Sequence, residues 1–114
     1  MNARTQRSNE SIKAVLALAA VTLLCRVWAF GNPVFNIDEQ FYVFVGERML
    51  HGTLPYVDIW DRKPVGLFLI YAFAARVFSD PVVGYQVLAA LSVLATAWLI
   101  YRVARRFAAF PAAL

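Results

Sequence analysis

The segment VVGYQVLAALSVLATAWLIY, residues 82–101, has twenty residues without a charge. About 20 apolar residues form a helix long enough to cross the hydrocarbon core of a bilayer. A second apolar stretch, residues 12–30, has Lys13 at its start and Arg26 near its end. The 114-residue chain is 61% hydrophobic, well above the content of ordinary soluble domains. The sequence therefore predicts an all-α integral membrane protein, with two transmembrane helices that flank an outer segment.

The first apolar stretch also has features of a secretory signal peptide. Arg4, Arg7 and Lys13 form a basic start. However, Arg26 and Trp28 occupy the place where the small residues of a cleavage site are needed. In an uncleaved helix, Arg26 can extend to the interface beside Trp28 in the aromatic belt. We therefore expect a transmembrane helix here, with a cleaved signal peptide as the alternative.

The distribution of charge predicts the topology. The net charge is +4, and the excess of positive charge is at the two ends of the chain. The N-terminal end has three basic residues, Arg4, Arg7 and Lys13, and one acidic residue, Glu10. The C-terminal end has Arg102, Arg105 and Arg106 and no acidic residue. Residues 31–81 instead contain more acidic than basic side chains. The positive-inside rule then places both ends in the cytoplasm and residues 31–81 outside the cytoplasmic (inner) membrane. No basic stripe interleaved with aromatic residues is present, so nucleic acid is not an expected partner.

One apolar run tests this topology. VGLFLIYAFAARVF, residues 65–78, would place the C-terminal arginines outside if it crossed the membrane. As a helix it is only about 21 Å long, whereas the hydrocarbon core is about 30 Å thick. We expect an interfacial or re-entrant helix. A third span is the alternative, because tilting and a thin membrane weaken the length rule.

The outer segment is expected to contain two juxtamembrane helices, about residues 37–50 and 64–78. Asn36 can cap the first helix, with Glu39 in the capping box, and Gly52 stands at the expected C-cap. The linker TLPYVDIWDR, residues 53–62, is expected to be extended, and Pro64 suits a first helical position. Asp80 and Pro81 are then the cap and first residue of the second transmembrane helix.

Two polar sites in the outer segment are candidates for chemistry. Asp38 and Glu39 have a structural explanation, because carboxylates are favoured in the first turn of a helix. Lys63 precedes a proline, so it lies just outside a helix start with free backbone N–H groups, and Gly66 allows a ligand to approach closely. Such a place attracts an anion, above all a phosphate. The alternatives are that Lys63 and Arg62 neutralise nearby aspartates or contact lipid headgroups.

These motifs resemble a known family. An N-terminal span followed by DEQFYVFVGERMLHG and YVDIWDRKPVGLFLIYAFAARVF is similar to the start of GT-C membrane glycosyltransferases. The similarity is to the protein-mannosyltransferase-like group, which includes lipid A aminoarabinose transferases and rhizobial lipopolysaccharide-core glycosyltransferases. In that family an acidic residue of the first outer loop is catalytic, and a Lys-Pro-Pro element binds the phosphate of a polyprenyl-phosphate sugar donor. This chain has Lys-Pro-Val instead, with the same proline after the lysine.

The resemblance implies specific roles. Asp38 is the expected catalytic base with Glu39 as its companion, and Lys63 is the expected contact to the donor phosphate. Arg62, Tyr42 and Asp61 are the further expected substrate contacts. The implied reaction is transfer of a sugar from polyprenyl phosphate to a lipid, polysaccharide or protein acceptor. The resemblance implies no certain cofactor. Asp38 and Glu39 could hold a divalent metal, but two ligands do not specify one.

The length of the chain leads to one more expectation. Members of the family have several hundred residues and roughly ten or more spans, so the chain resembles an N-terminal fragment that is inactive alone. The missing C-terminal part of the same enzyme would then be its partner, together with membrane lipid. A small non-enzymatic membrane anchor or assembly protein and an inactive gene remnant are the alternatives.

Overall fold

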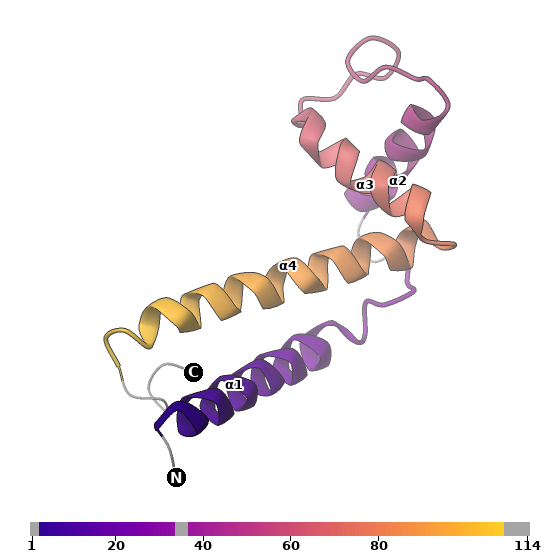
Figure 1. Ribbon diagram of the computed structural model, residues 1–114. Coiled ribbons are helices and arrows are strands. Elements are labelled where there is room, and N and C mark those ends of the chain that lie inside the picture. Colours follow the sequence, from indigo (N-terminus) through magenta and orange to yellow (C-terminus); the bar gives the residue numbers. More distant parts are fainter. Residues whose placement is uncertain (1–2, 34–36, 109–114) are drawn as a thin grey trace. The chain divides into compact units, whose positions relative to one another are not determined.

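The computed structural model describes residues 3–33 and 37–108, and this part of the chain is all-α, as predicted (Figure 1). Its four helices are α1 (Ala3–Arg26), α2 (Ile37–Leu50), α3 (Val65–Val77) and α4 (Pro81–Ala104). Two segments are long and apolar enough to cross a membrane, Ser8–Arg26 and Pro81–Ala104. The chain forms two compact units. We call residues 28–89 the middle unit, and residues 3–27 with 90–108 the end unit.

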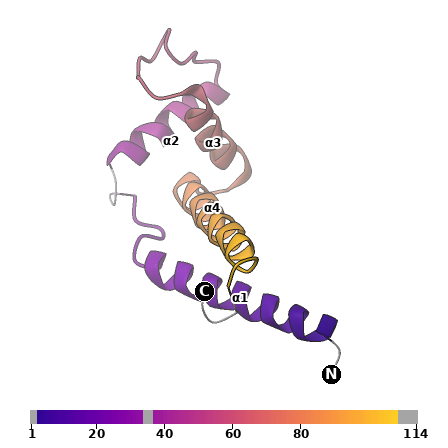
Figure 2. The ribbon, with the colours of Figure 1, turned by 90° about the vertical axis from the view of Figure 1, so that its left-hand side faces the viewer.

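The core of the middle unit lies mainly between α2 and α3. These two helices lie against each other in both views (Figures 1 and 2). Val45 of α2 and Phe68 of α3 are each only 1% exposed. The helices approach closely because Gly46 has no side chain. A Cβ atom at this position would lie 2.6 Å from the backbone nitrogen of Ala72. Gly46 therefore sets how near α2 can come to α3.

The predicted bounds of the first outer helix, residues 37–50, agree with α2. Its C-terminus is closed as expected by Gly52, which has a φ of +91°. The Gly52 N–H donates to Met49 O at 3.1 Å and the Thr53 N–H to Arg48 O at 3.1 Å. These are the two hydrogen bonds of a Schellman motif. The predicted cap Asn36 lies outside the described residues.

The predicted start of the second apolar helix is also confirmed. α4 begins at Pro81, and Asp80 Oδ1 accepts hydrogen bonds from the N–H groups of Val82 at 2.8 Å and Val83 at 3.3 Å. A side-chain oxygen that accepts from the first free N–H groups is what an N-cap requires. α4 extends to Ala104, beyond the predicted end at residue 101.

The first apolar helix differs from its predicted range, 12–30. α1 begins at Ala3 and ends at Arg26, so the prediction of a helix to residue 30 is wrong. The following turn is held by Gln86, whose Nε2 donates to Ala29 O at 2.8 Å and whose Oε1 accepts from Gly31 N–H at 2.8 Å. Gly31 has a φ of +73°, which favours glycine. A distant side chain thus satisfies the backbone that a longer helix would have used.

The sequence predicts an extended linker between α2 and α3, and this prediction is wrong. The linker instead turns back on itself. Leu54 N–H donates to Asp58 Oδ2 at 2.8 Å, and Asp58 N–H donates to Leu54 O at 3.0 Å. Tyr56, with a φ of +69°, donates its N–H to Ile59 O at 2.7 Å. Pro64 also differs slightly from expectation: it caps α3, with a ψ of 144°, and Val65 is the first helical residue.

We expect Gly46→Ala to destabilise the middle unit by about 1 to 3 kcal/mol, the usual cost of overpacking. The added Cβ meets backbone atoms of α3, which cannot rotate away. Thermal unfolding in detergent micelles, followed by circular dichroism, measures the change. Gly66→Ala is the matched control, because a Cβ there meets nothing within 4 Å. A Gly46→Ala protein as stable as the Gly66→Ala protein would contradict the close approach.

Candidate functional site

The two adjacent carboxylates in the first turn of α2 have different surroundings. Asp38 is exposed, whereas Glu39 is partly buried. Burial of the Tyr71 hydroxyl and the nearby negative charge of Glu39 raise the pKa of Tyr71 above its ordinary value of 10.0. Glu39 therefore faces the aromatic core of the middle unit, whereas Asp38 lies on the exposed side of the same turn.

Packed aromatic rings connect this turn to the lysine that precedes α3. The ring centroids of Tyr71 and Tyr42 are 5.5 Å apart, and those of Tyr42 and Phe68 are 6.0 Å apart. Phe68 in turn contacts Tyr56 at 6.3 Å. The Tyr56 hydroxyl donates to Lys63 O at 2.5 Å. A continuous set of rings thus runs from the neighbour of Glu39 to the turn that contains Lys63.

The start of α3 keeps hydrogen-bonding capacity for a ligand. Pro64 provides no side-chain cap, although Leu67 N–H donates to Pro64 O at 3.0 Å. The position of the Gly66 Cβ is open space. The Lys63 backbone is fixed from the other side, since its N–H donates to Asp61 Oδ1 at 2.8 Å. Lys63 is therefore held beside an open helix N-terminus, where an anion is favoured.

The alternative in which Lys63 and Arg62 neutralise nearby aspartates is not supported. Among the described residues, neither cation forms an ion pair with a carboxylate. The Asp58 and Asp61 carboxylates accept backbone N–H groups of the linker instead. The role of these two carboxylates is thus to fix the turns of the linker.

Two further predicted site residues, Tyr42 and Asp61, have structural roles. Tyr42 is 8% exposed and belongs to the core, and Asp61 fixes the turn before α3. Sequence reasoning missed Tyr71 as the neighbour of Glu39, and Tyr85, whose ring centroid is 5.0 Å from that of Tyr71. Both tyrosines lie within apolar runs, where nothing in the sequence distinguishes them from packing residues. Within residues 3–33 and 37–108, no cluster of three or more His, Cys, Asp or Glu side chains is suited to a metal ion.

Comparisons with protein-family models, curated proteins and solved structures find no match to this chain.

We expect Glu39→Gln to lower the pKa of Tyr71, because it removes the negative charge that opposes ionisation of the hydroxyl. Stability follows with a defined sign. The folded state holds the Tyr71 proton more tightly than the unfolded state, so stability falls as the pH rises above about 10. Glu39→Gln should weaken that fall, and Tyr71→Phe should remove the contribution of this group.

Absorbance of tyrosinate against pH in detergent micelles measures the change in pKa. Thermal unfolding over the same pH range measures the linked stability. Asp38→Gln is the control, because it removes a neighbouring carboxylate that is exposed. Equal effects of Asp38→Gln and Glu39→Gln would contradict the different surroundings of the two residues.

Proposed function

We propose that the chain acts in a membrane glycosyltransferase that resembles the GT-C family and takes its sugar from a polyprenyl-phosphate donor. The observation that carries the proposal is the surroundings of Lys63. This lysine precedes Pro64, the cap of α3, and forms no ion pair with a carboxylate among the described residues. The Gly66 position in the first turn of α3 is open. A cation beside free helix N–H groups suits a phosphate better than any neutral ligand.

In this proposal Lys63 stabilises the departing phosphate. Negative charge grows on the phosphate oxygen as its bond to the sugar carbon breaks. A fixed cation at that oxygen stabilises the transition state more than the ground state, and this difference accelerates the reaction. The hydrogen bonds of Tyr56 and Asp61 hold the Lys63 backbone in place. The leaving group is the polyprenyl phosphate.

Asp38 is the proposed general base. Its exposed carboxylate takes the proton of the acceptor hydroxyl or amine, while the acceptor atom forms the new bond to the anomeric carbon of the sugar. Glu39 is the less suitable base because it faces the tyrosines of the core. Within the acidic pair, we therefore assign proton transfer to Asp38 and a positioning role to Glu39.

We further propose that α1 and α4 span the cytoplasmic membrane, with both chain ends in the cytoplasm. The two apolar segments are only 11% and 6% buried, in contrast to a core helix of a soluble protein. Large apolar side chains on both helices are exposed, for example Leu24 at 70% and Leu99 at 64%. Lipid would cover these side chains, and the lipid-linked donor would reach Asp38 and Lys63 from the same bilayer.

We expect Lys63→Ala to weaken binding of a polyprenyl phosphate to the purified chain about 10- to 100-fold. A hydrogen bond to a charged group contributes about 1.5 to 3 kcal/mol, and each 1.4 kcal/mol corresponds to about tenfold in affinity. Lys63→Arg should keep most of the affinity, and Asp38→Asn should leave it unchanged. Binding is measured with the lipid titrated into protein in detergent micelles. Equal affinities of the Lys63→Ala and wild-type proteins would overturn the phosphate contact and favour a membrane anchor.

Turnover separates the two carboxylates. In the longest open reading frame that contains these 114 residues, Asp38→Asn should lower sugar transfer by about 100-fold or more while donor binding persists, because only the base is lost. Glu39→Gln should act mainly through stability. Release of labelled sugar from a panel of polyprenyl-phosphate sugars is the measurement. Normal turnover of a folded, donor-binding Asp38→Asn protein would show that this carboxylate is not the base.

The topology is tested by labelling single cysteines from outside intact cells, in a background of Cys25→Ala. Thr53→Cys lies in the proposed outer linker and should react with a membrane-impermeant maleimide. Phe107→Cys, at a side chain that is 86% exposed after α4, should react only after the cells are permeabilised. Reaction of Phe107→Cys in intact cells would contradict the arrangement with two spans.

A further inference from the structure

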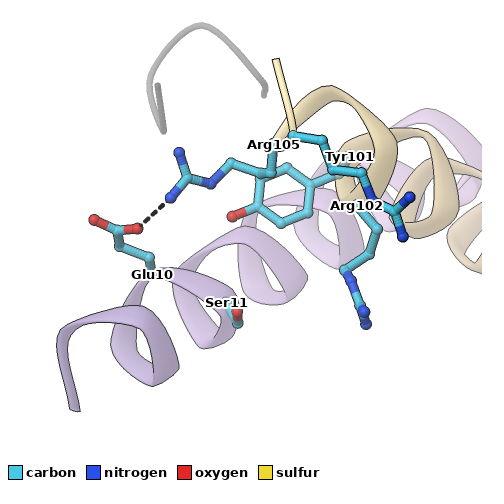
Figure 3. A pocket seen from close by; sticks show the side chains of 6 residues that line it. Glu10, Ser11, Tyr101, Arg102 and Arg105 are labelled. Carbon is cyan, nitrogen blue, oxygen red and sulfur yellow. Dashed lines mark hydrogen bonds and ion pairs between the residues drawn. The ribbon is translucent and has the colours of Figure 1, made fainter. Parts of the chain in front are cut away.

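A pocket in the end unit is lined by side chains of opposite charge from its two helices. Its volume is about 260 Å³. Figure 3 shows that Glu10 and Ser11 come from α1, whereas Tyr101 and Arg102 come from the end of α4 and Arg105 from the turn that follows. Arg106 completes the lining. None of these residues belongs to the site around Asp38 and Lys63.

The pocket carries more positive charge than its own carboxylate can neutralise. Arg105 Nη2 is paired with Glu10 Oε2 at 2.7 Å (Figure 3), and its Nη1 donates to Ala108 O at 3.2 Å. Among the described residues, no carboxylate forms an ion pair with Arg102 or Arg106. One acidic and three basic side chains leave the pocket with a net charge of about +2 near pH 7. Such a site favours an anion.

Contacts on α4 hold part of the pocket in place before any ligand arrives. The Arg102 guanidinium lies over the Trp98 ring, 5.9 Å from its centroid. Trp98 stacks on Tyr101 at 5.2 Å, and Tyr101 is only 3% exposed. A guanidinium fixed by a ring loses less freedom when it binds, and its planar group can donate two parallel hydrogen bonds to a phosphate.

The place of the pocket along the chain indicates where the anion comes from. It lies at the end of an apolar helix, next to a tryptophan and a tyrosine, residue types that are enriched at membrane interfaces. Basic pockets between helices on the cytoplasmic side bind anionic lipid headgroups. The volume is below the roughly 300 to 1,000 Å³ of sites for drug-sized ligands, so a headgroup fits better than a nucleotide.

We propose that this arginine pocket binds the phosphate of an anionic phospholipid headgroup. Arg102 and Arg106 supply the charge that the phosphate neutralises. Glu10 orients Arg105 and limits the net charge of the pocket. This proposal requires only that the end unit contacts a membrane, and it is independent of the proposed sugar transfer.

The test uses Trp98 as the reporter, because its ring lies against Arg102. The full chain with Trp28→Phe and Trp60→Phe is placed in phosphatidylcholine vesicles, so that only Trp98 fluoresces. Quenching by phosphatidylglycerol with brominated acyl chains is compared with quenching by phosphatidylcholine brominated in the same way. We expect a clear preference for phosphatidylglycerol.

Arg102→Gln with Arg106→Gln should reduce that preference about 25-fold. A basic residue near an anionic surface contributes roughly 1 kcal/mol, which is about fivefold in affinity for each arginine. Arg48→Gln with Arg76→Gln removes the same charge from the middle unit and should leave the preference unchanged. Glu10→Gln should increase the preference, because it removes the negative charge of the pocket.

Equal quenching by the two lipids in the reporter protein with its arginines intact would overturn the proposal. An equal loss of preference in the two double variants would also overturn it, and would indicate general electrostatic attraction to the anionic surface. Competition by inorganic phosphate beyond that of chloride at the same ionic strength would identify a soluble anion as the ligand and overturn the lipid assignment. If circular dichroism shows that the variant with both Arg102→Gln and Arg106→Gln does not fold, the lipid preference of Glu10→Gln is the test of the proposal. A preference that falls in Glu10→Gln contradicts an anion site.

Discussion

The close approach of α2 and α3 at Gly46 is the constraint on which the middle unit depends. A helix pair this close needs a residue without a side chain on one partner, because the facing atoms are backbone atoms of Tyr71 and Ala72. This contact brings Tyr71 near the first turn of α2 and lets the rings of Tyr42 and Phe68 fill the crossing. The surroundings of Glu39 are thus a consequence of one glycine seven residues further along the same helix.

Local signals predicted the ends of helices well. Gly52 and Asp80 act through hydrogen bonds to groups within a few residues, and such bonds can be inferred from sequence spacing. The end of α1 could not be found in this way. Gln86 holds the turn after α1 from a position 55 residues beyond Gly31. Nothing in the sequence around Gly31 indicates that its N–H will donate to a glutamine of another helix. The compact linker escaped prediction for a related reason, since its bonds depend on Tyr56 adopting a positive φ.

The candidate site shows the same limit at the level of single residues. Asp38 and Glu39 are adjacent in the sequence, which makes them resemble one acidic pair. On a helix, however, neighbours point about 100° apart, since 3.6 residues make one turn. One carboxylate is therefore exposed and the other faces the core. The sequence located the acidic turn correctly, but only packing against α3 distinguishes its two members.

In both units, basic side chains remain without an ion-paired carboxylate among the described residues. The carboxylates of Asp58, Asp61 and Asp80 accept backbone N–H groups, so they stabilise turns and a helix start instead of neutralising cations. Glu10 does pair with an arginine, but that pocket contains two more. Acidic side chains used for local structure leave cations whose charge no described carboxylate balances. In both of our proposals, a lipid phosphate balances this charge: the phosphate of a sugar donor in the middle unit and a phospholipid headgroup in the end unit.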